Sequence, residues 1–409
     1  MKKTIALILA LALVFTAAVP CFAAAGSWKR GDSFYFGEYP QSLVHNESLA
    51  AALKKQPLQW RSYGYFGQIK TWENPYDKFN EYDMLYADLS YQGERYRAVT
   101  FSNYRSHTAD YYPRYPESSS HQESNGYHKD TVYFFKYEPL EWIVLDPSQG
   151  LVLSKMIIDS QHFALAYFSD SGNIYTDETR TYFANAYGES DLAYWLDNTF
   201  MQTAFSDAEQ ADIRLSTLDN SVPGYAAYGS PSSRNRVFPL SVTDAENQNF
   251  GFVKNADRCA QGTAYAKAQG LSVETVYQNH YGNSYWYLRT GSNERTGTIS
   301  IVDEGGVIVP ESLKSTYIGV RPAMRIDLRS KAITDPNAPQ TGRTPGDVDA
   351  DGVVTASDAR LALRCAVGLE NYLPASDAFI ACDVDRDAYV TASDARLILR
   401  AAVGLEKLS

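Results

Sequence analysis

The chain reads Asp347-Val-Asp-Ala-Asp-Gly-Val-Val-Thr-Ala-Ser-Asp358 near its C-terminus, and this stretch is written twice. Thirty-six residues later it returns as Asp383-Val-Asp-Arg-Asp-Ala-Tyr-Val-Thr-Ala-Ser-Asp394. The similarity continues for twelve more residues in each copy, and only five of the 24 aligned positions differ. A repeat this similar indicates one structural unit that is used twice.

Each copy carries carboxylates at positions 1, 3, 5 and 12 of a twelve-residue loop. Calcium takes roughly six to eight oxygen ligands, so this spacing predicts two calcium ions. Position 7 would contribute its backbone carbonyl, and position 9 would act through water or its hydroxyl. The alternative is an acidic surface repeat without metal. The predicted ligands are Asp347, Asp349, Asp351, Val353, Thr355 and Asp358, then Asp383, Asp385, Asp387, Tyr389, Thr391 and Asp394.

A short helix is predicted after each loop, because T-x-x-D is a helix start and apolar residues follow it. These apolar residues are Leu361, Leu363 and Val367, then Leu397, Leu399 and Val403, with Gly368 and Gly404 suited to left-handed caps. Position 6 differs, being Gly352 in the first copy and Ala388 in the second. The sharp turn there favours glycine, so we expect the second site to be weaker.

A duplicated calcium loop with only its exit helix resembles the type I dockerin of cellulosome-forming bacteria. The segment before the first loop contains Pro339 and Pro345, which do not suit an entering helix. The resemblance covers residues 346–409 and implies a small all-α module that docks onto a cohesin domain of a scaffold protein. It implies cohesin contacts at loop positions 10 and 11 and at a later arginine: Ala356, Ser357 and Arg364, and Ala392, Ser393 and Arg400. The two sets are identical, so docking is expected in either of two orientations.

The first residues predict export from the cell. Met1-Lys-Lys precedes the apolar run Ile5–Ala18, and small residues follow at 23–25, which together are typical of a secretory signal peptide, assigned to residues 1–24. No other stretch is apolar for long enough to span a membrane. We therefore expect a secreted, extracellular protein with no membrane attachment after cleavage.

Charge and cysteine content narrow the class of protein further. The formal charge of −11 argues against nucleic-acid binding, which requires a basic face. Beyond the signal peptide, three cysteines remain, and an odd count leaves at least one thiol unpaired. In a dockerin the helices run antiparallel, which implies proximity of Cys365 and Cys382. They are expected either to form a disulfide or to be small apolar residues of the core.

Residues 27–330 predict a large α+β module, joined to the C-terminal one by a proline-containing linker at 331–345. Early strands are expected at 34–40, 138–145 and 150–154, and late ones at 286–289, 298–302, 306–309 and 317–328. A helix is expected over 190–200, and capping boxes at 206–209 and 243–246 predict two more.

This module resembles the bacterial domain-of-unknown-function family 6273. The matching stretches include Phe36-Gly-Glu-Tyr-Pro-Gln41, Pro139-Leu-Glu-Trp-Ile-Val-Leu145, Trp286-Tyr-Leu-Arg289 and Gly319-Val-Arg-Pro-Ala323. The last two also give a weaker likeness to C-type-lectin-like and formylglycine-generating folds. The chain departs from the family by an insertion at about 70–130 that is rich in Tyr, Ser, Asn and His.

No catalytic constellation stands out, and no catalytic residue or organic cofactor is predicted. Cys259 with His162 or His280 is a possible thiol–imidazole pair or an ordinary cysteine. Arg289 and Arg321 either bind a ligand carboxylate or are structural charges at strand ends. The aromatic side chains in the insertion suggest a sugar-stacking platform or simple packing on the module: Tyr104, Tyr111, Tyr112, Tyr115 and Tyr127.

Two functions therefore remain open for the large module. One is a non-catalytic domain that binds carbohydrate or a cell surface within a polysaccharide-degrading complex. The other is a glycoside hydrolase or esterase of that complex, which would need a facing pair of carboxylates or a nucleophile.

Overall fold

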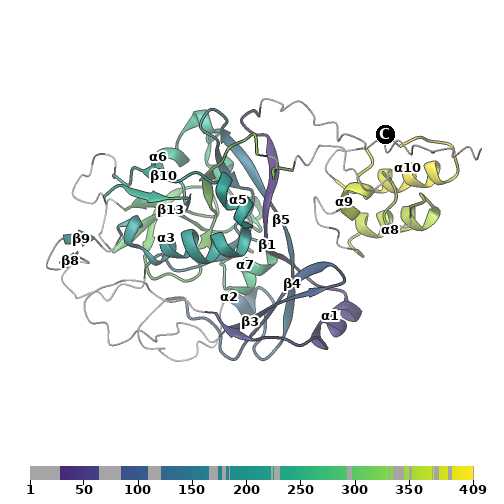
Figure 1. Cartoon of the computed structure of the whole chain (residues 1–409), viewed down its shortest axis with the longest axis horizontal. Helices are drawn as coiled ribbons and strands as arrows, with labels where there is room; N and C mark the ends of the chain where they lie inside the picture. The colour runs from purple at the N-terminus through teal and green to yellow at the C-terminus, as the bar shows by residue number, and fades with distance from the viewer. Residues whose placement is uncertain are drawn as a thin grey trace, which may run out of the picture.

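The computed structural model of the chain describes residues 28–63, 84–108, 121–164, 174–176, 181–183, 185–222, 224, 231–292, 297–330, 332–334, 345–349, 352–370, 372, 377–385 and 389–408. Strands and short helices are mixed as far as residue 325, and the elements of the described residues after it are helices (Figure 1). This order confirms the α+β class of the large module and the helical character of the C-terminal region. The predicted signal peptide and most of the predicted linker lie outside the described residues.

An eight-stranded antiparallel sheet is the largest element of the module. Its order is β12-β17-β6-β5-β4-β3-β2, and β1 pairs with β5. The 14-residue β5 is central because β4 pairs with its start, β6 with its end and β1 along most of its length. The strands are β1 (Ser33–Leu43), β2 (Arg61–Ser62), β3 (Met84–Tyr91), β4 (Glu94–Phe101), β5 (Tyr133–Asp146), β6 (Leu151–Ser154), β12 (Val237–Phe238) and β17 (Ala323–Arg325).

A second sheet has five strands in the order β15-β14-β13-β16-β7. The late strand predicted at 317–328 is wrong in extent, since it divides into β16 and β17, which belong to different sheets. Pro322 lies between them and lacks the N–H that a continuous ladder requires. The strands are β7 (Asp159–Ser160), β13 (Trp286–Gly291), β14 (Thr298–Val302), β15 (Ile308–Ser312) and β16 (Gly319–Val320); β8 (Ile174–Thr176) pairs with β9 (Thr181–Phe183), and β10 (Ser216–Leu218) with β11 (Ser233–Asn235).

The helices of the module are short, and α1, α3, α5, α6 and α7 begin at polar caps. The predicted capping box of Ser206 and Glu209 is confirmed at the start of α5. The one predicted at Thr243 is wrong, because Ser241 and Asp244 form an overlapping box that starts α6 two residues earlier. The helices are α1 (Glu47–Lys54), α2 (His121–Ser124), α3 (Asp191–Trp195) continued by a π-helical turn (Leu196–Phe200), α4 (Met201–Ala204), α5 (Asp207–Asp212), α6 (Val242–Ala245) and α7 (Ala264–Ala268).

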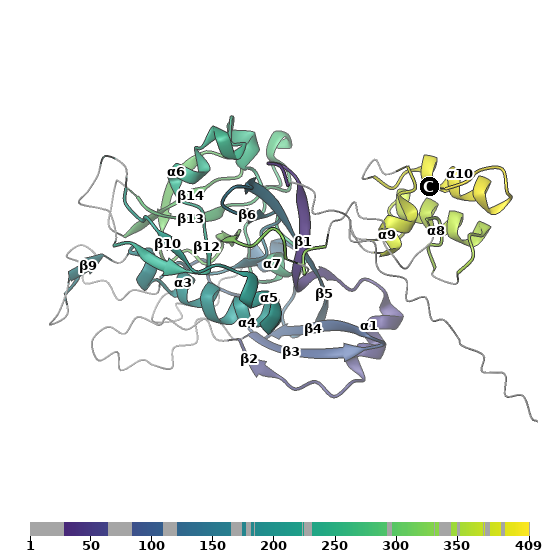
Figure 2. The same cartoon turned by 45° about the horizontal axis from the view of Figure 1, so that its top comes forward.

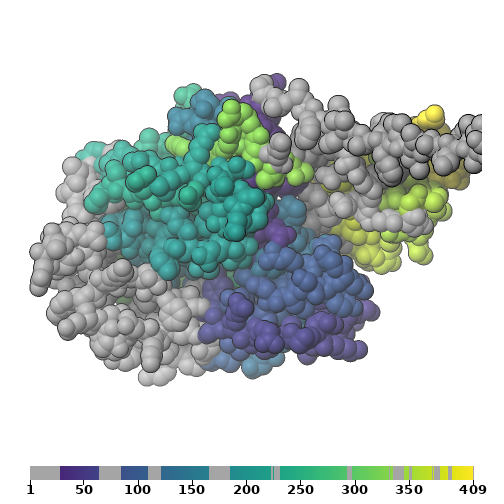
Figure 3. Space-filling view, viewed as in Figure 1, coloured from purple at the N-terminus to yellow at the C-terminus, as the bar shows by residue number. Residues whose placement is uncertain are grey.

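One hydrophobic core joins the early strands to the rest of the module. It runs from Phe34 to Ile326 and includes the fully buried Trp142 and Trp286. In the space-filling view the blue early strands and the teal helices form one continuous surface (Figure 3). Part of the predicted insertion is therefore sheet, because β3 and β4 continue the ladder from β5.

The C-terminal region is built on two 11-residue helices that pack together, α8 (Ala356–Ala366) and α10 (Ala392–Ala402) (Figure 2). A shorter helix, α9 (Asp377–Cys382), contacts both. They share a core of their own, separate from that of the large module. Half of its eight buried residues are alanine: Ala359, Ala362, Ala381 and Ala395, beside Val348, Cys382, Val384 and Ile398.

Candidate calcium loops and docking surface

The side chain of Asp358 closes the first loop because it accepts hydrogen bonds from the beginning of the loop and from Thr355 near its end. Its Oδ1 accepts hydrogen bonds from the backbone N–H of Val348 at 2.7 Å and of Asp349 at 3.1 Å. Its Oδ2 accepts from the backbone N–H of Thr355 at 2.8 Å and from its hydroxyl at 2.9 Å, which completes the predicted capping box of α8. Burial opposes ionisation, but these hydrogen bonds hold the pKa of Asp358 below its ordinary value. The side chain is therefore a carboxylate at neutral pH.

The second loop repeats this arrangement with longer bonds at its start. Asp394 Oδ1 accepts from the N–H of Val384 at 3.1 Å and of Asp385 at 3.4 Å, and its Oδ2 accepts from the N–H and hydroxyl of Thr391. Asp347 is buried in the first loop, whereas Asp383 is half-buried in the second. These differences agree in direction with the expectation that the second site is weaker.

Three predicted ligands come together in each loop. The side chains of Asp347, Asp349 and Asp358 place carboxylate oxygens within 4.8 Å of one another, and Asp383, Asp385 and Asp394 do the same. Two unit negative charges 4.8 Å apart near a protein surface repel by about 3.5 kcal/mol, and closer charges repel more strongly. A hard divalent cation bound by these oxygens removes the repulsion, and clusters of carboxylate oxygens suit such a cation. Asp351 and Asp387 lie outside the described residues.

Gly352 is required by its backbone conformation. Its φ of +88° is left-handed, and a Cβ there would meet nothing within 4 Å. Its N–H donates to Asp347 Oδ2 at 3.0 Å, so the turn orients a predicted ligand. Val353 and Tyr389 have exposed side chains, as expected of residues predicted to contribute only a carbonyl.

The residues predicted to contact a partner are all exposed: Ala356, Ser357 and Arg364 on α8, and Ala392, Ser393 and Arg400 on α10. Large apolar side chains in the same two repeats are exposed as well. Of the apolar residues named for the two helices, Leu361 and Leu397 pack against the core, whereas the others are exposed. The close packing of α8 against α10 buries small residues such as Ala362 in their place. The exposed apolar residues occupy the same positions in both copies: Leu363 (45 % exposed), Val367 (61 %) and Leu369 (65 %), and Leu399 (46 %), Val403 (63 %) and Leu405 (68 %).

This geometry agrees with a comparison against known families. Residues 345–401 are a type I dockerin domain. The match supports calcium binding and a component that docks onto a cohesin, as in cellulosome-type complexes. The dockerin domain thus contains both loops and the exposed residues Arg364 and Arg400.

A second family model covers most of the large module. Residues 148–328 match DUF6273, a domain of unknown function. The similar stretches at 36–41 and 139–145 lie before this range, although they form β1 and β5 of the same sheet. No curated protein and no solved structure matches the chain. Among the described residues, no helix is long and apolar enough to cross a membrane.

The proposed disulfide of the dockerin domain is wrong. Cys365 and Cys382 are both thiols, and so is Cys259. Cys382 is fully buried in the dockerin core, while Cys365 on α8 is only half-buried. The alternative of small residues in the core therefore holds for Cys382.

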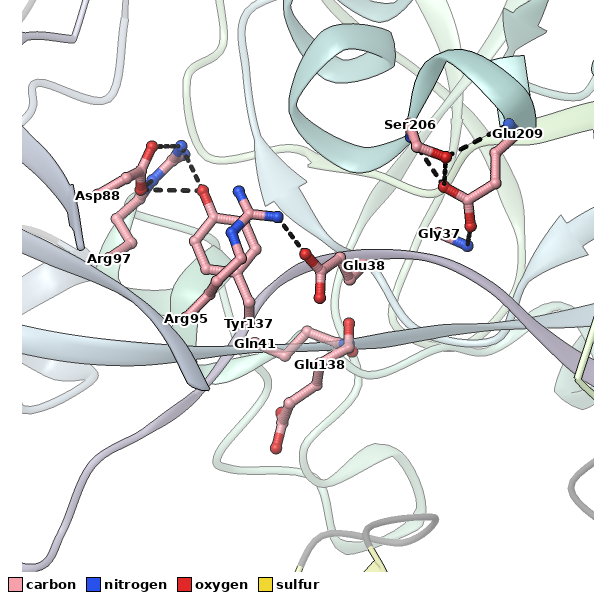
Figure 4. A network of polar contacts seen from close by, with 10 residues as sticks. All are labelled: Gly37, Glu38, Gln41, Asp88, Arg95, Arg97, Tyr137, Glu138, Ser206 and Glu209. Carbon is pink, nitrogen blue, oxygen red and sulfur yellow. Dashed lines mark hydrogen bonds and ion pairs between the residues drawn. The ribbon is translucent and has the colours of Figure 1, made fainter. Parts of the chain in front are cut away.

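A polar network links the early strands of the large module (Figure 4). Arg97 on β4 binds Asp88 on β3 through two bonds of 2.8 and 2.9 Å, and it donates to the hydroxyl of Tyr137 on β5 at 2.8 Å. Arg95 pairs with Glu38 and lies 4.1 Å above the ring of Tyr137. Each arginine is therefore paired with a carboxylate of the same sheet, Arg97 with Asp88 and Arg95 with Glu38.

A separate set of hydrogen bonds connects β1 to α5 (Figure 4). Glu209 caps its helix by binding Ser206 and also accepts the N–H of Gly37 at 3.1 Å. A Cβ on Gly37 would lie 2.5 Å from Phe205, so only glycine fits there. Glu38 and Glu138 point away from each other and so do not form a facing pair (Figure 4).

Glu138 supplies a pH-dependent prediction. Burial raises the pKa of Glu138 from 4.5 to about 7. Between these values the carboxyl is ionised in the unfolded chain but still largely protonated in the folded one, so the free energy of unfolding falls as pH rises. We expect Glu138→Gln, which still accepts the N–H of Ser42, to stabilise the large module by about 2 kcal/mol at pH 8 and hardly at pH 4. Urea denaturation across this range measures the difference. An equal effect at both pH values would contradict the assigned cause.

The other candidate residues of the large module are structural in this arrangement. Arg289 binds Asp244 and the carbonyl of Pro239, and Arg321 binds backbone carbonyls, which favours the alternative of structural charges. Burial raises the pKa of the Cys259 thiol, and nearby Asp303 adds to this, which disfavours a reactive thiolate.

The described histidine and tyrosine candidates also make structural contacts. His162 is buried and pairs with Asp191 at 3.1 Å. Tyr127 is buried and donates to the carbonyl of Ala264, so its assignment to an exposed platform is wrong. Tyr104 packs against the core, and Tyr111, Tyr112 and Tyr115 lie outside the described residues.

Proposed function

We propose that this chain is a secreted component of a cellulosome-type complex, and that its calcium-loaded dockerin domain docks onto a cohesin of a scaffold protein. The observation that carries this proposal is the pair of equivalent exposed surfaces beside the two acidic loops. Exposed apolar side chains that gather on one surface mark sites of interaction with a partner. Here Leu363, Val367 and Leu369 recur as Leu399, Val403 and Leu405.

Two calcium ions would fix these surfaces in place. Asp358 and Asp394 sit in the first turns of α8 and α10, so a cation bound to them orders the helices that carry Arg364 and Arg400. Metal binding and folding are coupled at sites of this kind. Docking should therefore require calcium.

Titration of the full chain with a panel of type I cohesin domains tests the proposal. We expect calcium-dependent binding to at least one cohesin. Changing both copies, as Leu363→Asp with Leu399→Asp, should weaken it by roughly a hundredfold or more, because a charge then faces an apolar partner. Either copy alone should cost about twofold, since the other orientation remains. Binding that survives chelation, or that ignores the double change, would contradict it.

We propose a polysaccharide or cell-surface ligand for the large module, carried into the complex as cargo. The supporting observation is a cluster of contacting, half-buried rings from separate segments, Tyr285, Tyr317, His121 and His107. Their centroids are separated in turn by 6.3, 5.1 and 4.4 Å. Such rings suit stacking against sugars. A glycan array with a parallel hydrolase and esterase screen on the full chain separates this reading from an enzyme.

A further inference from the structure

An ion pair of the same design lies at the end of each repeated helix of the dockerin domain. Arg364 Nε donates to Glu370 Oε1 at 2.9 Å, and Arg400 Nε donates to Glu406 Oε2 at 3.1 Å. In both copies the acid follows the arginine by six residues. The Nη atoms of both arginines make no hydrogen bond within the described part of the chain.

The backbone holds the acid in this place. Gly368 has a φ of +73°, and the turn it makes lets the N–H groups of Leu369 and Glu370 donate to the carbonyl of Arg364 itself. Gly404 has the same φ in the second copy, where Leu405 donates to the carbonyl of Arg400. Each arginine is therefore bound at both its carbonyl and its Nε by one short turn.

Folding stability does not account for these pairs. The arginine side chains are 45 % and 49 % exposed, and ion pairs this exposed contribute little to stability. Their geometry does have a directional effect. A guanidinium is a rigid planar fork, so fixing Nε against a carboxylate fixes the plane and leaves the Nη edge available to a partner.

We propose that Glu370 and Glu406 are positioning residues that hold Arg364 and Arg400 for docking. This inference rests on the proposed cohesin binding. Because each arginine is neutralised by its own acid and lies among exposed apolar side chains, the fitting partner face is apolar with an uncharged acceptor, such as a carbonyl or hydroxyl. Docking should then depend only weakly on salt, unlike the pairing of an arginine with an acidic patch.

Variants of both copies in the full, calcium-loaded chain test the proposal. We expect Glu370→Ala with Glu406→Ala to weaken cohesin binding roughly fivefold and to introduce salt dependence, because the arginines become mobile and uncompensated. Glu370→Gln with Glu406→Gln should retain most of the affinity, since the amide oxygen still accepts from Nε. In a background of Arg364→Ala with Arg400→Ala, the alanine changes at the acids should have no further effect.

The outcomes distinguish positioning from other roles. Calcium affinity and amide-exchange protection of the dockerin domain should be the same in all variants, whereas a structural role would lower both. The proposal would be overturned if the affinity losses of the glutamate and arginine variants add independently. It would also be overturned if Glu370→Ala with Glu406→Ala binds cohesin as tightly as the parent chain does. Absence of cohesin binding by the parent chain would instead contradict the proposed function.

Discussion

Chelation of calcium in the full chain is expected to abolish amide hydrogen-exchange protection across α8 and α10 while leaving β5 and β13 unchanged. Among the described residues of the dockerin domain, the core has eight buried side chains, half of them alanine, so it removes little apolar surface from water. Isolated helices of 11 residues are marginal in water. A domain this small requires a disulfide or a structural metal to be stable, and the structure has no disulfide among its described cysteines. The acidic loops are then what holds the helices together.

Substitution of the loop-closing aspartates should reproduce the effect of chelation. Asp358→Ala with Asp394→Ala removes a proposed ligand from each loop and also the acceptor of four hydrogen bonds in each. We expect exchange protection in α8 and α10 to be lost even in millimolar calcium. Ala388→Gly is the opposite control, and it should tighten the weaker calcium step several-fold because a glycine suits the sharp turn. Protection that survives both chelation and the double substitution would contradict the coupling.

The dockerin loops were predictable because their information is local. Asp358 and Thr355 are three residues apart, and the same short spacing specifies both the cap of α8 and the acidic cluster. The repeat added a second, independent instance of the pattern at Asp394 and Thr391. Chemistry fixed by neighbours in sequence needs no knowledge of the tertiary fold.

Contacts between distant residues were not predictable in the same way. Leu408 packs so closely on Gly346 that a Cβ there would lie 2.5 Å from it, and nothing in either segment indicates this. Hydrophobicity alone would bury Val367 before Ala362, yet Ala362 is buried and Val367 is exposed. The close approach of α8 and α10 decides which of the two is covered. Glu370 was missed because its role depends on the turn at Gly368.

The large module shows the same limit. Tyr127 stands in a polar stretch of sequence yet is buried, because it packs against Tyr133 and Phe135 of β5 and donates to Ala264 of α7, which is 137 residues away. The strands β3 and β4 read as an insertion, although they form register-matched pairs with each other and with β5. Long-range pairing, not local propensity, determined these placements.

Asp88→Ala is expected to destabilise the large module by about 3 kcal/mol, because it leaves the buried Arg97 without its carboxylate. Only 5 % of the Arg97 side chain is exposed, and Asp88 faces it directly across β3 and β4. Burial opposes ionisation of Asp88, but the hydrogen bonds and charge of Arg97 hold its pKa below 3.8. The carboxylate therefore stabilises the fold at neutral pH, and this contribution is lost as pH falls below that value.

An exposed ion pair between β4 and β5 of the same sheet provides the matched control. Lys136 and Glu94 lie 3.2 Å apart with 34 % and 51 % of their side chains exposed, so Glu94→Ala should cost less than about 0.5 kcal/mol. Urea denaturation of the full chain, followed by exchange protection in β4 and β5, measures both variants. Adding Arg97→Leu to Asp88→Ala should recover part of the loss, since it removes the unpaired charge itself. If Asp88→Ala costs no more than Glu94→Ala, water reaches Arg97 in solution and the network is not a buried one.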